Sequence, residues 1–100
     1  TGAIKICHAA EGFGLDAEIH GPGPAHRHLM SSIRNTNFYE LGLLNPKATD
    51  NFDVCYLDYS DAIDAVDQDG CVHVPDGPGL GVQLNWEYIL QNRTGGRVWE

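Results

Sequence analysis

Apolar side chains recur at helical spacing in two stretches near the start of the chain. In residues 2–11 the apolar positions are Ile4, Ile6, Cys7 and Ala10. In residues 25–34 they are Leu29, Met30 and Ile33. Apolar residues with this period are typical of a helix that packs one face on a core. The pattern therefore predicts two helices, and Gly12 and Gly14 provide an end for the first.

Each predicted helix is followed by a short segment with the composition of a strand. Residues 15–20 end at the glycine- and proline-rich stretch 21–24, which breaks regular structure, and residues 37–41 form the second segment. The order helix, strand, helix, strand predicts a right-handed parallel βαβ crossover. The first half of the chain is therefore expected to have an α/β fold.

The second half begins with an irregular stretch after Glu40. Residues 62–66 and 71–74 flank Asp67-Gln68-Asp69-Gly70, whose Asp-Gly step predicts a β-hairpin of two short strands. Residues 75–81 form a glycine-rich loop without the flanks of a P-loop, which favours a tight turn that packs one backbone on another. Residues 85–91 predict a closing helix that Asn85 caps.

Composition narrows the class of protein. One hundred residues with 42% hydrophobic content suffice for one domain with a modest core. The formal charge of −8 argues against nucleic acid or an anionic membrane as a partner. Three cysteines without a CxxC spacing predict reduced thiols and a cytoplasmic location. No run reaches the roughly 20 apolar residues of a membrane span. Because no initiator Met precedes Thr1, the chain is expected to be a fragment.

Two groups of polar residues invite a metal-site interpretation. Eight of the fourteen acidic residues lie between Asp50 and Asp76, where interleaved apolar residues favour a solvated surface, and the spacing of a calcium-binding EF-hand is absent. His20, His26 and His28 are close in sequence, but the last two would lie on different faces of a helix, which disfavours zinc. A solvent-facing or phosphate-binding role is expected for His26 and Arg27, and a structural role for His8 and His73.

His20 and Glu40 are the strongest candidates for chemistry. Each ends one of the two strand-like segments. Adjacent strands of a parallel sheet or barrel bring their carboxyl ends to the same rim, so an imidazole and a carboxylate would face one pocket. The sequence contains no nucleophile elbow, and general acid–base chemistry is therefore the better match.

The order of these features resembles the enolase superfamily. A segment ending in Glu18-Ile19-His20 is followed twenty positions later by one ending in Glu40, and residues 78–81 read Pro-Gly-Leu-Gly. This is similar to the mandelate racemase and muconate lactonising enzyme branch, particularly its acid-sugar dehydratases. The resemblance implies the C-terminal segment of a modified TIM (β/α) barrel: the last two βα units and a C-terminal tail with a small β-hairpin. Residues 1–100 would belong to the barrel domain, with the N-terminal capping domain and earlier strands absent.

The resemblance also implies a reaction. Members remove the proton α to a carboxylate and use Mg²⁺ to stabilise the enediolate. His20 would be the base of the seventh strand, and Glu40 would hydrogen-bond the enediolate. The Mg²⁺ ligands would lie outside this chain, which is therefore expected to be inactive alone and to need the remainder of the same polypeptide.

The sequence leaves three functional hypotheses open. Dehydration of a sugar acid is favoured, because one histidine can take the α proton and protonate the leaving hydroxyl. The alternatives are a racemase, epimerase or cycloisomerase of the same superfamily, and a small non-catalytic α/β binding module. The expected partner is a small carboxylate substrate, and the full-length enzyme is expected to be a homo-oligomer.

Overall fold

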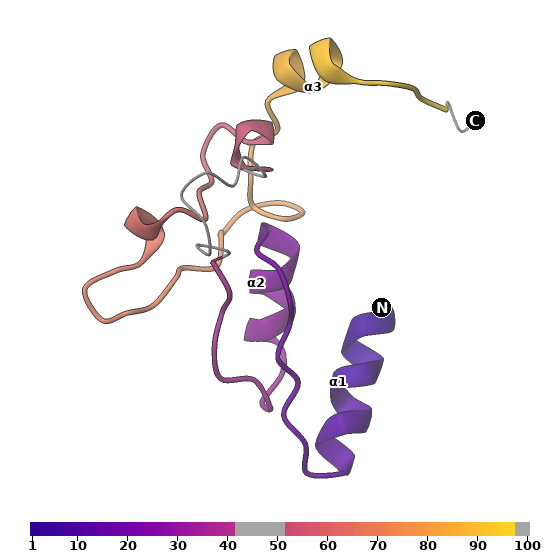
Figure 1. Cartoon of the computed structure of the whole chain (residues 1–100), viewed down its shortest axis with the longest axis vertical. Helices are drawn as coiled ribbons and strands as arrows, with labels where there is room; N and C mark the ends of the chain where they lie inside the picture. The colour runs from indigo at the N-terminus through magenta and orange to yellow at the C-terminus, as the bar shows by residue number, and fades with distance from the viewer. Residues whose placement is uncertain (42–51, 98–100) are drawn as a thin grey trace.

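The computed structural model describes residues 1–41 and 52–97, and the elements of this part are helical (Figure 1). They are the α-helices α1 (Gly2–Gly12), α2 (Pro24–Ser31) and α3 (Trp86–Asn92) and the short 3₁₀ helices η1 (Phe52–Cys55) and η2 (Ile63–Ala65). The described residues contain no assigned β-strand. Residues 42–51 of the irregular stretch predicted after Glu40 lie outside the described residues.

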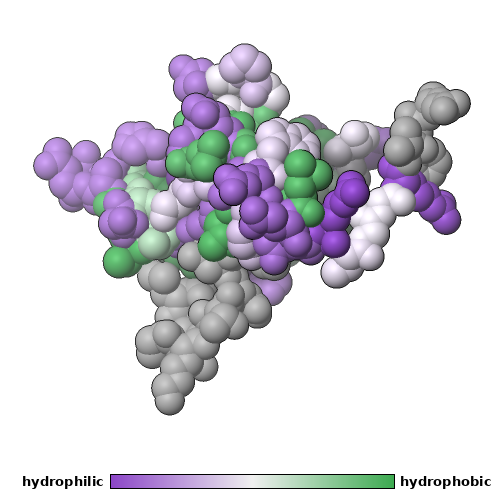
Figure 2. Space-filling view, turned by 90° about the horizontal axis from the view of Figure 1, so that it is seen from above, coloured by the Kyte–Doolittle hydropathy of each residue, from purple (hydrophilic) through white to green (hydrophobic). Residues whose placement is uncertain are grey.

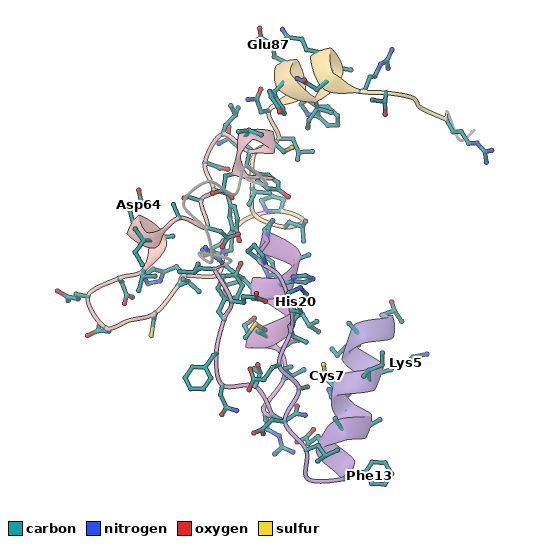
Figure 3. The ribbon with its side chains drawn as sticks, in the orientation of Figure 1. Lys5, Cys7, Phe13, His20, Asp64 and Glu87 are labelled. Atoms are coloured by element: carbon teal, nitrogen blue, oxygen red, sulfur yellow. The ribbon has the colours of Figure 1, made fainter. Side chains whose placement is uncertain are left out.

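Helix α1 confirms the first predicted helix, but it buries fewer of its apolar side chains than the pattern predicts. Cys7 is 2% exposed, whereas Ile6 is 71% exposed, so the expectation that Ile6 is buried is wrong. The Asn35 side chain donates to the Cys7 carbonyl at 3.1 Å and links α1 to the segment after α2. Phe13, just after the helix, projects away from the chain, and Cys7 faces inward (Figure 3).

The two predicted strands are extended neighbours, but they do not form a hydrogen-bonded ladder. Their contacts advance together along both segments: Ala17 N–H donates to the Asn35 carbonyl, Phe38 N–H to the Glu18 carboxylate, and Gly21 N–H to the Glu40 carboxylate. This order is the register of parallel segments. One backbone-to-backbone bond is too few for a ladder, and carboxylates accept from the Phe38 and Gly21 N–H groups instead. The expectation of two paired strands is therefore corrected.

Helix α2 lies between the two extended segments in sequence and starts where the pattern predicts. Pro24 occupies its first turn, where a missing N–H costs nothing. The helix ends at Ser31, three residues before the predicted end at Arg34. Ser31 and Ser32 donate their hydroxyls to the carbonyls of His28 and Leu29, a local bond that competes with continued helix.

The predicted hairpin forms its turn but not its strands. Gly70 has φ +80°, and its N–H donates to the Asp67 carbonyl at 3.1 Å. Pairing across the turn is limited to a single antiparallel bridge, Val66 to Val72. The first predicted strand is mostly occupied by the 3₁₀ helix η2, so the expectation of two strands is wrong.

The final elements follow the sequence signals closely. The Asn85 side chain accepts a hydrogen bond from Tyr88 N–H at 3.1 Å and caps α3, as predicted. Helix α3 packs against η1, and a bridge joins Tyr56 to Leu84. In the glycine-rich loop a Cβ on Gly81 would lie 2.9 Å from the Pro75 carbonyl carbon, which confirms a backbone-on-backbone turn.

The interior of the described part is small and contains charge. Its buried residues include Cys7, Ile33 and Tyr59 together with Arg27 and Asp61. Many large apolar side chains are exposed, and hydrophobic atoms lie among polar ones on the face in Figure 2. Exposed apolar surface of this kind is typical of a surface that packs against other protein. Within residues 1–41 and 52–97, no helix has both the length and the apolar character that a membrane crossing requires.

Candidate active site

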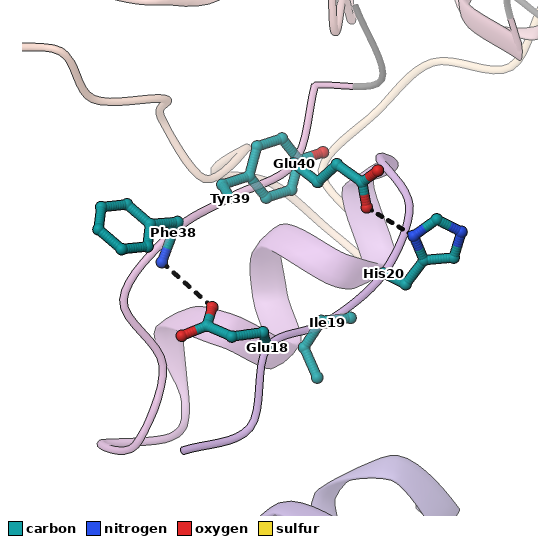
Figure 4. Close-up of a pocket in the computed structure, with 6 residues that line it drawn as sticks. All are labelled: Glu18, Ile19, His20, Phe38, Tyr39 and Glu40. Atoms are coloured by element: carbon teal, nitrogen blue, oxygen red, sulfur yellow. Dashed lines mark hydrogen bonds and ion pairs between the residues drawn. The ribbon is translucent and has the colours of Figure 1, made fainter. Parts of the chain in front are cut away.

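His20 and Glu40 meet at the same end of the two extended segments. The Nδ1 atom of His20 lies 2.8 Å from Oε2 of Glu40 (Figure 4). The pairing follows from the parallel register, because residues about twenty positions apart face one another along both segments. The two candidates from the sequence are thus in direct contact. The imidazole is 94% exposed and the carboxylate 33% exposed, so the pair is open to a small molecule.

The backbone fixes the ionisation of Glu40. Its Oε2 accepts a hydrogen bond from Gly21 N–H at 2.7 Å, and this bond is the largest cause of a pKa below the ordinary glutamate value. Partial burial opposes the shift, and the neighbouring His20 adds to it. Glu40 is therefore a carboxylate at neutral pH and accepts hydrogen bonds without donating them.

The ionised Glu40 carboxylate determines which ring nitrogen of a neutral His20 carries the proton. Because the ionised carboxylate can only accept, Nδ1 of His20 must be the donor. A neutral imidazole with its proton on Nδ1 has its lone pair on Nε2. The arrangement leaves Nε2 available to take a proton from a substrate.

A hollow of about 520 Å³ adjoins the pair. Its lining is formed by six residues of the two extended segments: Glu18, Ile19, His20, Phe38, Tyr39 and Glu40. At the other end of the hollow, Glu18 accepts from the Asn37 side chain at 2.9 Å and from Phe38 N–H at 3.3 Å (Figure 4). The Asn37 bond, with the backbone bonds, holds the pKa of Glu18 below its ordinary value. The hollow has the volume of a small-molecule site.

A buried polar cluster lies behind this site and was not predicted. It consists of Arg27, Tyr39, Tyr59 and Asp61. Arg27 Nη2 lies 2.6 Å from Asp61 Oδ1, and these side chains are 6% and 7% exposed. The expectations of a solvent-facing Arg27 and of a fully solvated acidic run are therefore wrong. Arg27 shares a helix face with Met30, three residues on, and that spacing was the available signal.

The Arg27 guanidinium stays charged inside the cluster. Burial by itself would lower the pKa of Arg27, but the hydrogen bonds that the guanidinium donates to its neighbours raise it overall. Burial raises the pKa of Tyr39 and, more strongly, that of Tyr59. Both phenols stay protonated and can donate to Asp61.

Three of the other four histidines, His26, His28 and His73, have separate partners. His26 Nδ1 contacts the Gly21 carbonyl at 2.7 Å, and His28 Nε2 contacts the Leu80 carbonyl at 3.1 Å. His73 pairs with Asp67, whose pKa is lowered chiefly by the Cys71 N–H bond. Across residues 1–41 and 52–97, no group of three or more histidine, cysteine or acidic side chains could hold a metal ion. All three cysteines are free thiols.

The family model described as enolase C-terminal domain-like matches residues 1–88. The chain belongs to this family. The match covers both extended segments, α2, the buried cluster and the glycine-rich loop, and it falls in the mandelate racemase and muconate lactonising enzyme branch. Comparisons with curated proteins and with solved structures gave no significant match.

Membership of the enolase family gives the site its chemical context. Superfamily members abstract a proton next to a carboxylate and generally use Mg²⁺. Mg²⁺ needs several oxygen ligands in near-octahedral geometry. The described residues do not bring such a set together, so they do not fit a complete Mg²⁺ site. The catalytic roles of His20 and Glu40 stay predictions.

Proposed function

We propose that this chain is the C-terminal part of the barrel domain of an enzyme that removes the proton α to a carboxylate, and that the reaction is dehydration of a sugar acid. The observation that carries the proposal is the 2.8 Å contact between His20 Nδ1 and Glu40 Oε2 beside an open hollow. Membership of the enolase family supports the reaction class.

His20 is the proposed acid and base. With its Nδ1 proton directed to Glu40, Nε2 takes the α proton of the substrate. The C–H electron pair first moves toward the carboxylate and gives the enediolate, which then forms the carbon–carbon double bond as the bond to the β-hydroxyl breaks. The proton on Nε2 passes to that hydroxyl, which leaves as water, and the resulting enol becomes a 2-keto acid. One histidine thus performs both proton transfers.

Glu40 is proposed to orient His20 and to stabilise the imidazolium that forms. The carboxylate is already ionised and held by Gly21 N–H, so little rearrangement accompanies the proton transfer. The expected hydrogen bond from Glu40 to the enediolate requires a protonated carboxyl. In the contact described above, Glu40 acts on His20 instead.

Dehydration is favoured over the other reactions of the family for a chemical reason. A racemase or epimerase needs a second base on the opposite face of the substrate, whereas elimination needs one group that first accepts and then donates a proton. Cycloisomerisation stays the further alternative.

Mg²⁺ is assigned to ligands elsewhere in the complete polypeptide. When bound, it would offset the negative charge on the substrate carboxylate. We further propose a homo-oligomeric assembly and a cytoplasmic location, which the three free cysteines favour. The charge of −8 gives no reason to expect nucleic acid or an anionic membrane as a partner.

The proposal is tested by incubating the complete polypeptide with a library of sugar acids and Mg²⁺ in D₂O. We expect at least one acid to lose water and to give a 2-keto acid, detected by NMR. Deuterium entering the α position without loss of water would favour a racemase or epimerase. If no acid reacts or exchanges, the non-catalytic module is the better account.

A further inference from the structure

The buried cluster is connected to the glycine loop that follows His20. We propose that Tyr39, held by Asp61 and Arg27, is a positioning residue that fixes this loop and thereby the contact between His20 and Glu40. The inference rests on the proposed role of His20. It assigns the buried cluster a part in positioning that residue. The evidence lies in the hydrogen bonds of two consecutive residues.

Tyr39 and Glu40 hold the loop at two points. Gly23 N–H donates to the Tyr39 hydroxyl at 2.7 Å, and Gly21 N–H donates to Glu40 Oε2 at 2.7 Å. Side chains alternate sides along an extended segment, so Tyr39 reaches into the buried cluster while Glu40 reaches His20. One short segment therefore sets the position of both ends of the loop.

The loop needs such external contacts at its two glycines, because Pro22 and Pro24 fix only their own φ angles. Gly21 has φ +92° and Gly23 has φ +134°. Glycine adopts such conformations at little steric cost, and it can change to others equally easily. His20 directly precedes these glycines, so a change in the loop displaces its backbone. A displacement of about 1 Å can reduce turnover by roughly 100-fold.

The cluster fixes the Tyr39 hydroxyl in turn. That hydroxyl donates to Asp61 Oδ1 at 2.7 Å, which leaves its lone pairs for Gly23 N–H. The Arg27 guanidinium lies over the Tyr39 ring, 5.1 Å from its centroid, and bonds the same carboxylate oxygen. Buried groups therefore hold both the hydroxyl and the ring of Tyr39 in place.

Arg27 also carries the cluster's connection to distant segments. It donates to the Ser60 carbonyl at 2.7 Å and to the His73 carbonyl at 2.9 Å. Ser60, just before the predicted hairpin, and His73, in its second segment, therefore contribute to the position of the loop. This gives residues 59–74, which do not line the hollow beside His20, a function in the site.

The test is hydrogen exchange at Gly21 and Gly23 in the complete polypeptide, which requires no substrate. Tyr39→Phe removes one oxygen and keeps the ring. We expect the Gly23 amide to exchange roughly fivefold faster, as for one ordinary hydrogen bond. The Gly21 amide, whose acceptor is Glu40, should also exchange at least twofold faster, because the loop moves as a unit. Tyr88→Phe is the matched control: Tyr88 lies on α3 outside the cluster, and removing its hydroxyl should leave the exchange rates of both amides unchanged.

Turnover provides the second readout. With the substrate identified, Tyr39→Phe should lower kcat by roughly 10- to 100-fold and leave KM within a few-fold. Tyr88→Phe, on α3, should leave both values unchanged. Faster exchange at Gly23 alone, with Gly21 and kcat unchanged, would overturn the positioning role and leave the role of His20 intact.

A variant that does not fold would not end the test. In the unsubstituted protein, the proposal predicts that the Gly21 and Gly23 amides open together, with the same dependence on denaturant. Different dependences would overturn it. Failure of His20 as the base would instead appear as unchanged turnover in a His20 variant, with loop exchange unaffected.

Discussion

Arg27 and Asp61 are 34 positions apart, and their charged groups meet at 2.6 Å in the interior of the chain. A buried ion pair is weak evidence for stability as such, because desolvation offsets much of the attraction. Loss of either partner is costly, however, because the other would remain buried without an opposite charge. The pair thus makes the positions of α2 and of residues 59–61 depend on each other.

Removing the positive charge should be strongly destabilising. In Arg27→Ala, Asp61 would keep a buried charge without its guanidinium partner, so we expect a loss of about 3 to 5 kcal/mol. Arg34→Ala is the matched control, because Arg34 forms an exposed pair with Glu11 and should cost at most about 1 kcal/mol. Denaturant unfolding of both variants checks the difference. Equal losses would show that the buried pair is not a structural requirement.

The two glycines of the Pro-Gly-Leu-Gly loop should differ in their tolerance of alanine. Gly79 and Gly81 have φ +68° and +67°, so each substitution should cost about 1 to 2 kcal/mol for the left-handed conformation. A Cβ at Gly81 would also lie 2.9 Å from the Pro75 carbonyl, whereas none of the described atoms lies within 4 Å of one at Gly79. Gly81→Ala should therefore cost roughly 1 to 3 kcal/mol more. Thermal unfolding of both variants gives the comparison, and a greater loss in Gly79→Ala would contradict it.

Acid should weaken the contact between Glu40 and the loop. The pKa of Glu40 is lowered in the folded chain, first by the Gly21 N–H bond, so the unfolded chain binds the proton more readily. The stabilisation is therefore fully present above the ordinary glutamate value of about 4.3 and is lost as pH falls through the lowered value. Amide exchange at Gly21 between pH 3 and 5, corrected for intrinsic rates, measures it. Glu40→Gln should abolish this pH dependence, and a pH dependence that persists in that variant would assign it to another group.

The chain of residues 1–100 should bind Mg²⁺ weakly. Its described residues do not gather three or more metal-binding side chains, and the dication needs several oxygen donors. Calorimetric titration should give no tight stoichiometric site. A one-to-one site in this titration would place the metal ligands within these residues and require a new account of the metal.

The sequence predicted the local structure better than the long-range contacts. The apolar spacing located α1 and α2, and the Asp-Gly step and Asn85 located the turn and the cap, because these signals act between near neighbours. The parallel register that brings His20 to Glu40 also followed from the order of elements.

The errors concern residues whose environment is set by distant segments. A solvent-facing or phosphate-binding role was predicted for Arg27, because its partner Asp61 is 34 positions away and no local signal points to it. Asp61 was likewise grouped with a run of acids, since sequence alone does not show which of them turns inward. The prediction of two strands failed for a related reason: a strand needs a hydrogen-bonded partner, and here carboxylates accept from the Phe38 and Gly21 N–H groups.

The central claim is that His20 moves the α proton, and exchange of that proton in D₂O tests it most directly. The measurement compares the complete polypeptide with His20→Asn and with His8→Asn, an exposed histidine on α1, using a sugar acid that the unsubstituted enzyme turns over. His20→Asn should slow exchange and turnover by roughly 10²- to 10⁴-fold, and His8→Asn should leave both unchanged. Glu40→Gln should lose less, on the order of 10²- to 10³-fold, because its amide oxygen can still accept from His20. If His20→Asn exchanged the α proton within a few-fold of the unsubstituted enzyme, His20 would not be the base.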